Sequence, residues 1–147
     1  MLFFCIKTTM NQSEMIHQYI NHPMHKPLNM SVALKESSAK ITMSVHSSVL
    51  NFVGILHGSI YFKLMDDACF FAVIATNQSS FVVTSNMTVN YIKPVSEGMI
   101  ITHASVITTR GRLYLCESHI TNAEGAILAH ATGSFIEPKT TYKYKKP

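Results

Sequence analysis

The feature that most constrains the fold is an apolar segment of nineteen residues, Gly58 to Thr76, that contains no proline. Nineteen residues without a breaker are too many for a strand, so the segment predicts a helix. Its composition is apolar nearly all round, which is typical of a helix buried inside a domain rather than lying on its surface. The rest of the chain is therefore expected to surround it.

The flanking segments predict short strands. Before the helix, alternating apolar residues predict two strands, near 32–34 and 41–45, joined by a turn at Glu36-Ser37-Ser38. After it come four strand-like stretches separated by turn residues, at 81–92, 99–109, 113–121 and 127–135. One helix fills a two-layer core only if the sheet curls around it. The pattern therefore predicts an α+β domain in which a curved antiparallel sheet wraps around one long apolar helix.

The N-terminal part divides into two pieces. Residues 1–9 differ in character from the rest of the chain, and we expect them to be a dispensable extension. Ser13 or Asn11 is expected to cap a short helix that runs to about Ile20. The length of 147 residues is that of one domain, and no linker divides it, so residues 10–138 are expected to form a single domain.

The number and distribution of charged residues limit the kinds of partner that we expect for this chain. The net charge of +4 lies partly in a basic tail, residues 139–147, which is expected to be a solvated end. No recognition motif accompanies the charge, so nucleic-acid binding is not expected. Charged residues make up only 14%, below the ~25% of typical soluble domains, which predicts apolar surface buried between subunits. No apolar run approaches the ~18 residues of a membrane helix, so no membrane partner is expected.

Cysteine and histidine spacing argues against metal and disulfide sites. Cys5, Cys69 and Cys116 are widely spaced and form no CxxC pair, which fits a reduced, cytoplasmic compartment. The histidines, such as His17 and His22, show no metal-ligand spacing. Neither a metal nor another cofactor is expected.

The most specific signal lies between residues 51 and 68. It reads Asn51-x-x-Gly54-x-x-His57-Gly58-Ser59, followed in the predicted helix by Leu64-x-Asp66. This resembles the hotdog-fold acyl-CoA thioesterases of the phenylacetate-degradation (PaaI-like) type, whose pattern is N-x-x-G-x-x-H-G-G followed by a helix carrying L-x-D. A weaker similarity covers residues 84–94, including Tyr91-x-x-Pro94. The resemblance implies the hotdog fold, acyl-CoA hydrolysis, and sites between subunits of a homodimer or a tetramer.

Asp66 is the expected catalytic carboxylate. Thioester hydrolysis needs a group that attacks the carbonyl or takes a proton from the attacking water. A carboxylate in an apolar helix is costly unless it is paired or functional. Adjacent helix positions differ by ~100°, so Asp66 and Asp67 point in different directions. Lys63 could pair with either, and we expect it to pair with Asp67.

Other candidates lie near the helix start. The Gly58 N–H has no acceptor within the helix and lies at the positive end of its dipole, which suits a developing oxyanion. Asn51 is expected to orient water or the carbonyl, with an Asx turn as the alternative. Thr84 falls where many relatives have a water-orienting serine. His57 is a further candidate whose position also suits a structural role. Ser59 replaces the family's second glycine.

Spacing on the helix supports an oligomer. Gly58 and Asp66 are eight residues apart, roughly 12 Å along the axis, so one carbonyl cannot contact both in one chain. Two facing subunits could combine them. On charge alone, Arg110, Arg112 and Lys93 are candidates for binding the CoA phosphates.

Two other functions are open to a chain of this kind. A non-catalytic hotdog module that binds acyl-CoA as a sensor is the main alternative. A hotdog dehydratase would pair a histidine with an acid in a different context, and no such motif is present. The sequence does not indicate the acyl chain.

Overall fold

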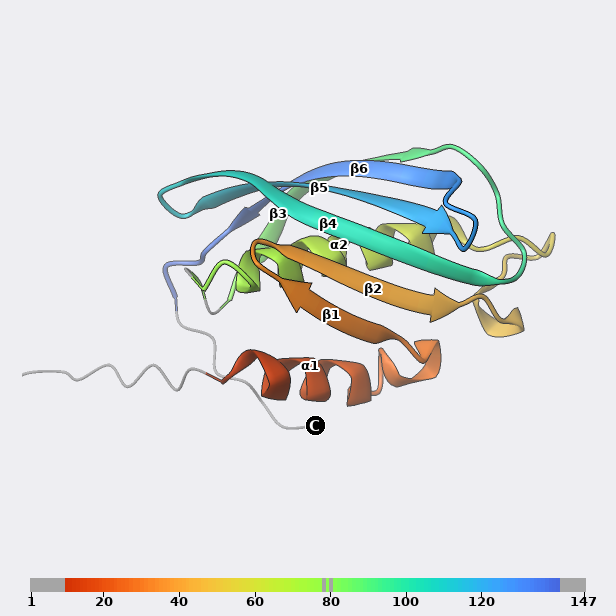
Figure 1. The fold of residues 1–147 in the computed structure, drawn as a ribbon, viewed down its shortest axis with the longest axis horizontal. Coiled ribbons are helices and arrows are strands. Elements are labelled where there is room, and N and C mark those ends of the chain that lie inside the picture. The colour runs from red at the N-terminus through yellow and green to blue at the C-terminus, as the bar shows by residue number, and fades with distance from the viewer. Residues whose placement is uncertain (1–9, 78, 80, 141–147) are drawn as a thin grey trace, which may run out of the picture.

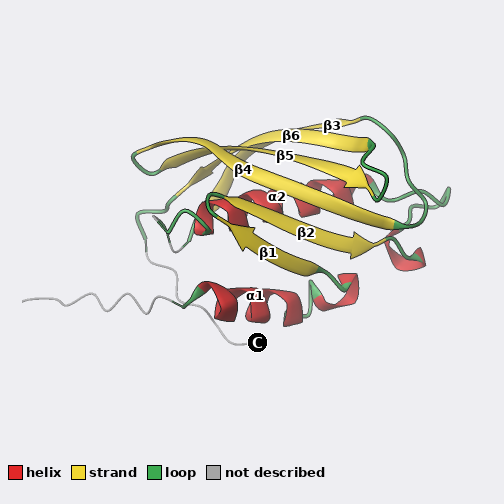
Figure 2. Ribbon diagram, viewed as in Figure 1, coloured by secondary structure: helices red, strands yellow, loops and turns green. Residues whose placement is uncertain are grey.

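The computed structural model describes residues 10–77, 79 and 81–140, and it shows one curved antiparallel sheet around a long helix (Figures 1 and 2). The predicted hotdog architecture is confirmed. The helices are α1 (Gln12–Asn21) and α2 (Gly58–Ile74), with short 3-10 turns at Lys26–Leu28 and Ser47–Val49. The strands are β1 (Ser31–Lys35), β2 (Ser38–Ser44), β3 (Val83–Tyr91), β4 (Met99–Arg110), β5 (Leu113–Asn122) and β6 (Ile127–Ile136).

The sheet order is β1-β2-β4-β5-β6-β3, and every neighbouring pair is antiparallel. β3 follows α2 in the chain but lies at the edge of the sheet beside the last strand, β6. The other edge is β1, and Figure 1 shows α1 running beside it. β3 therefore carries one edge of backbone N–H and C=O groups that no described strand of this chain pairs.

The core forms between α2 and the inner face of the sheet. Most of α2 is buried, as its composition predicts, and Phe71 packs in the same cluster as Phe135 of β6. Full burial of a side chain of this size stabilises the fold by about 1.5–3 kcal/mol. Cys69 and Cys116 are buried free cysteines, as expected of small core residues. One part of α2 stays outside the core, since Phe62 is 39% exposed.

The short N-terminal helix is α1. Asn11 is its cap, because the Asn11 side chain accepts a 2.8 Å hydrogen bond from the Glu14 N–H. α1 contacts α2 through Tyr19, whose ring meets that of Phe71 edge-on at 4.9 Å between centroids. In the part of the chain that the structure describes, no helix is long and apolar enough to cross a membrane.

The predictions for the two chain ends are not tested. Residues 1–9 and 141–147 lie outside the described residues, so the dispensable extension and most of the basic tail stay predictions.

Candidate active site

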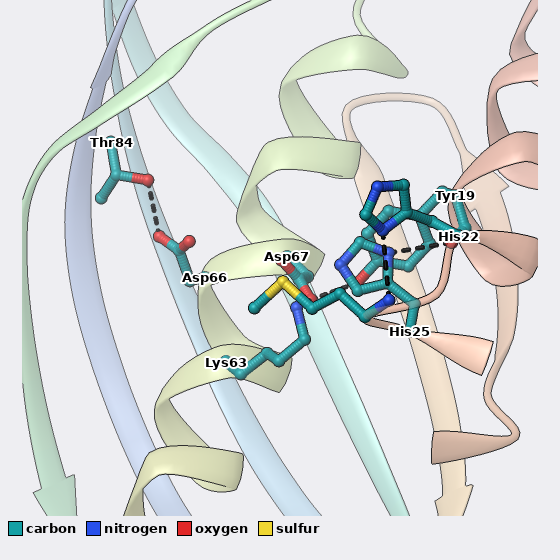
Figure 3. A network of polar contacts seen from close by, with 8 residues as sticks. Tyr19, His22, His25, Lys63, Asp66, Asp67 and Thr84 are labelled. Atoms are coloured by element: carbon teal, nitrogen blue, oxygen red, sulfur yellow. Dashed lines mark hydrogen bonds and ion pairs between the residues drawn. The ribbon is translucent and has the colours of Figure 1, made fainter. Parts of the chain in front are cut away.

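Asp66 lies in the middle of α2, on the side that faces β3. Its Oδ1 accepts a 2.7 Å hydrogen bond from Thr84 Oγ1 (Figure 3). Both residues are predicted site residues, and the structure brings them together. The carboxylate is half-buried, and its described hydrogen-bond partner is a neutral hydroxyl.

A β-bulge in β3 aims Thr84 at the helix. Met87 and Val89 pack on the core, so strict alternation would put Thr84 on the outer face with Asn86 and Thr88. The pairing of β3 with β6 shifts register between Thr84 and Asn86, however, and Thr84 pairs with the fully buried Phe135. The extra residue reverses the alternation and turns the Thr84 side chain inward.

The surroundings of Asp66 raise the pKa of its carboxyl. Burial is the main cause, the negative charge of Asp67 adds to it, and the Thr84 hydrogen bond and the Lys63 ammonium oppose it. Burial disfavours the charged form because the low-dielectric interior solvates it poorly. A carboxylate with a raised pKa is a stronger base, which suits proton abstraction or attack on a carbonyl.

Asp67 points to the other side of α2, toward α1 (Figure 3). Lys63 Nζ lies 2.7 Å from Asp67 Oδ2, which confirms the predicted pair. The Tyr19 hydroxyl donates to the same oxygen. Burial, followed by the negative charge of Asp67, raises the pKa of Tyr19 far above its usual range, so Tyr19 stays a neutral donor. No sequence pattern marks Tyr19 as a member of this group.

Gly58 is the first residue of α2, about two helical turns before Asp66. The Tyr91 hydroxyl donates a 3.1 Å hydrogen bond to the Gly58 carbonyl. A Cβ at Gly58 would lie 3.6 Å from the Tyr91 ring, an ordinary contact distance, so packing alone does not demand glycine here. In the sequence Tyr91 stands out only as part of a turn motif, which does not predict its contact with the helix start.

Two predicted site residues in the loop before α2, His57 and Asn51, accept hydrogen bonds from nearby backbone N–H groups. His57 is the N-cap of α2: its Nδ1 accepts from the Ser59 N–H at 3.1 Å and lies 2.7 Å from Ser59 Oγ. This is the structural role considered for His57. Asn51 Oδ1 accepts from the N–H groups of Val53 and Ile55, at 3.1 and 3.2 Å, so the alternative Asx-type loop contact is present. Only the Asn51 Nδ2 group is left to act on a substrate.

The candidate residues fall into two groups at opposite ends of β3. Thr84 with Asp66 lies near the start of the strand, and Tyr91 with Gly58 lies at its end. Thr84 and Tyr91 are seven positions apart along the strand, or about 24 Å when extended. Within one chain the candidate residues therefore lie in two separate groups.

The basic candidates are also divided. Arg112 lies in the β4–β5 turn, directly before Leu113, which pairs with Ile136. Ile136 also pairs with Val83 at the start of β3, whereas Lys93 follows the end of β3. The Arg112 guanidinium donates a 2.9 Å hydrogen bond to the Glu137 carbonyl. Within one chain, Arg112 and Lys93 therefore cannot contact the same phosphate.

Several exposed apolar side chains lie on β3 and on the neighbouring segments of the chain. They come from the loop before α2, from α2 and from both ends of β3: Phe52, Val53, Ile55, Phe62, Phe81, Val83, Tyr91 and Ile92. We call this set the β3 apolar surface. An open strand edge with apolar neighbours is a surface that another chain can pair with.

Other parts of the molecule offer weaker candidates. Among the described residues, no group of three or more His, Cys, Asp or Glu side chains could hold a metal ion. An open groove on the outer face of the sheet is lined by residues that include Lys40, His103 and His119, and this face points away from α2.

Comparisons with known proteins agree with the fold. The model of the thioesterase superfamily matches residues 53–129. A Saccharolobus solfataricus protein proposed to be an esterase is 24% identical over 108 residues, covering 74% of this chain and 72% of that protein.

Solved structures extend the agreement. The PaaI protein of the Escherichia coli phenylacetic acid degradation operon superposes with a TM-score of 0.76, at 23% identity, over 85% of this chain and 91% of that one. Thioesterase HI1161 of Haemophilus influenzae gives a TM-score of 0.77 at 19% identity, over 88% and 92%. A Streptococcus pneumoniae thioesterase protein solved with coenzyme A gives 0.69 at 24% identity, over 74% and 87%. Further structures of a protein with that description carry alanine in place of an aspartate or a threonine.

Proposed function

The chain belongs to the thioesterase superfamily and is a thioester hydrolase, and we propose that it cleaves acyl-CoA to a free carboxylic acid and CoA. The observation that carries this proposal is the Asp66–Thr84 pair, a half-buried carboxylate held by a hydroxyl. The Streptococcus relative with bound coenzyme A supports the substrate class. Aspartate and threonine are also the residue types that were replaced in the variant structures bearing that protein's description.

The proposed chemistry needs no group beyond those of the chain. Asp66 either attacks the thioester carbonyl or takes a proton from the water that attacks it. The Gly58 N–H stabilises the negative charge that develops on the carbonyl oxygen. The C–S bond then breaks, and the sulfur leaves as the CoA thiolate, which takes the proton that Asp66 removed from water or, in the nucleophilic route, a proton from solvent. In the nucleophilic route, water hydrolyses the resulting anhydride and regenerates Asp66.

A two-fold dimer would complete the site. If the open edges of two β3 strands pair antiparallel, the start of each strand lies beside the end of the other. The Asp66–Thr84 pair of one subunit then approaches the Gly58–Tyr91 pair of its partner. The same arrangement brings Lys93 toward Arg112 of the partner subunit, which offers a site for the CoA phosphates. The β3 apolar surface would be buried in this interface.

Thiol release tests the function. The wild-type protein is incubated with short, medium, long and aryl acyl-CoAs, and free CoA is measured. We expect turnover, and we expect Asp66→Asn to lower it by at least ~100-fold without loss of the fold. Binding of acyl-CoA without turnover by wild type would instead indicate the sensor function.

Subunit mixing tests the composite site. Asn51 lies in the loop before Gly58, and we expect it to act beside Gly58, so its lesion and that of Asp66 fall in different halves of the composite site. Asn51→Ala and Asp66→Ala proteins are combined and allowed to exchange subunits under mild denaturant. In a mixed dimer one site carries both lesions and the other neither, so activity should rise toward roughly a quarter of wild type. As a control, Asp66→Ala is mixed with Asp66→Asn, since every site in every dimer then lacks the Asp66 carboxylate and activity should not rise. If mass labels show exchange and activity does not rise in the first mixture, the site between subunits is ruled out.

A further inference from the structure

Lys63 stands between two carboxylates, and the structure shows which one it pairs with. At about 100° per residue, Lys63 lies about 60° from Asp66 around the axis of α2 and about 40° from Asp67. Spacings of three and four residues both allow contact. Lys63 Nζ lies 2.7 Å from Asp67, and the Asp66 carboxylate is bonded to Thr84 instead.

A second element fixes this choice. Tyr19 of α1 donates to the same Asp67 oxygen that Lys63 contacts, and its ring packs on Phe71. The Lys63 ammonium also lies 5.8 Å from the centre of the Tyr19 ring, within the range of a cation–π contact. Tyr19 thus holds both members of the pair on the α1 side of the helix (Figure 3).

Stability alone does not explain this arrangement. The side chains of Lys63 and Asp67 are only 17% and 16% exposed, so both charges are largely removed from water. Replacing such a pair by apolar residues is often neutral or stabilising, because desolvation offsets the attraction. A lysine placed within reach of a catalytic acid would, in contrast, weaken that acid's basicity directly if it were not held elsewhere.

We infer that Asp67 is a positioning residue that, together with Tyr19, holds Lys63 away from Asp66 and keeps the catalytic carboxylate free of an ion pair. The inference rests on the proposed function, since it assigns a consequence to the basicity of Asp66. The groups that face or act on Asp66 are Lys63, Asp67 and Cys69 of α2, the Thr84 hydroxyl of β3 and Tyr19 of α1.

The test compares pH profiles of kcat/KM for acyl-CoA hydrolysis by Asp67→Asn and by the double variant Lys63→Met/Asp67→Asn. In the single variant Lys63 is released and can pair with Asp66, and the charge of Asp67 is lost. Both changes lower the pKa of Asp66, so the acid limb should move to lower pH by about one unit, the low end of the effect of an adjacent opposite charge. Turnover on the plateau should fall roughly tenfold, well short of the loss from Asp66→Asn.

The double variant separates positioning from support of the fold. It removes the ammonium as well, so the acid limb should return toward its wild-type position and turnover should recover. If the two positions only support the fold, the double variant will be as slow as the single one or slower, and that result overturns the inference. An unchanged profile in Asp67→Asn overturns it too.

Lys63→Met alone keeps the inference testable if Asp67→Asn does not fold. It removes the ammonium that opposes the raised pKa of Asp66, so the acid limb should move to higher pH. The movement should stay below about one unit, because Lys63 does not contact Asp66 in the wild type; a larger movement would indicate an ion pair between them and would contradict the inference. Asp66→Asn is assayed in parallel to separate the two proposals. If Asp66→Asn stays active, the proposed function fails. If Asp66→Asn is inactive and Asp67→Asn behaves like wild type, only the role of Asp67 is refuted.

Discussion

Replacing Thr84 by valine probes the environment of the proposed catalytic carboxylate with little change of shape. Valine keeps the branched side chain that the inward-turned position of β3 accommodates, and it removes the hydroxyl that donates to Asp66 at 2.7 Å. The hydrogen bond stabilises the ionised form of Asp66, so its loss raises the pKa of that carboxyl further.

The size of this pKa shift depends on the strength of the hydrogen bond between Thr84 and Asp66. A hydrogen bond to a charged group contributes about 1.5–3 kcal/mol. Thr84 is exposed in the single chain, so solvent weakens the bond and the lower value applies. About 1.5 kcal/mol corresponds to roughly one unit of pKa. Because the active form is the carboxylate, activity is lost below a higher pH, and the acid limb of kcat/KM should move up by about one pH unit.

The assay is free-thiol release from acyl-CoA measured between about pH 4 and 9. Thr88→Val is the matched control, since Thr88 lies further along β3, opposite Thr132, with its side chain exposed. It should leave the acid limb where it is. An acid limb that stays fixed in Thr84→Val, or that moves equally in Thr88→Val, would show that the Thr84 hydroxyl does not act on the group that controls the rate.

The two groups of candidate residues and the chain ends support four further predictions. Gly58→Ala should fold normally, because the new Cβ meets Tyr91 at an ordinary contact distance of 3.6 Å, and circular dichroism checks the fold. Turnover should fall roughly tenfold or more, because the methyl group obstructs access to the residue 58 N–H, and thiol release checks this. At pH 7 Asp66→Asn should melt no lower than wild type, because a carboxyl whose folded pKa is raised loses stability as pH rises through that pKa. A chain starting at Met10 should assemble and hydrolyse like the full chain, and a lower melting temperature would show that residues 1–9 pack on the domain. Arg112→Ala should raise KM for acyl-CoA but not for an acyl-pantetheine without the nucleotide, and equal effects would exclude a phosphate contact.

The long helix and the strands could be predicted because their patterns are local. The apolar run from Gly58 onward is compatible with one kind of element, and α2 ends at Ile74, close to the predicted end. The bounds of β3, β4, β5 and β6 agree with the prediction to within two residues, since turn-forming residues close each strand. β2 instead begins at Ser38, three residues before its predicted start and inside the predicted turn. The Lys63–Asp67 pair was predicted for the same reason, as both members lie on one helix.

Contacts between segments far apart in the sequence were much harder to predict, because the local sequence pattern carries little sign of them. The inward direction of Thr84 depends on a bulge against β6, and alternation along β3 alone gives the opposite direction. The place of β3 at the sheet edge depends on the pairing of strands far apart in the chain. Tyr19 reaches Asp67 across 48 residues, and nothing in the sequence around either residue marks the contact. These features come from tertiary packing, which period and propensity do not encode.

Two observations separate Gly58 from Asp66 within one chain. The helical rise puts Gly58 and Asp66 roughly 12 Å apart, too far for both to contact one carbonyl. The hydrogen bonds from β3 agree with this separation, because Tyr91 at the end of the strand bonds to Gly58 and Thr84 near its start bonds to Asp66. The edge of β3 that no described strand pairs runs between the two groups, and it is the surface on which a second copy would reverse their order. The element that separates the two groups within one chain is thus the element that would join them between two chains, so assembly and catalysis should be lost together when that edge is blocked.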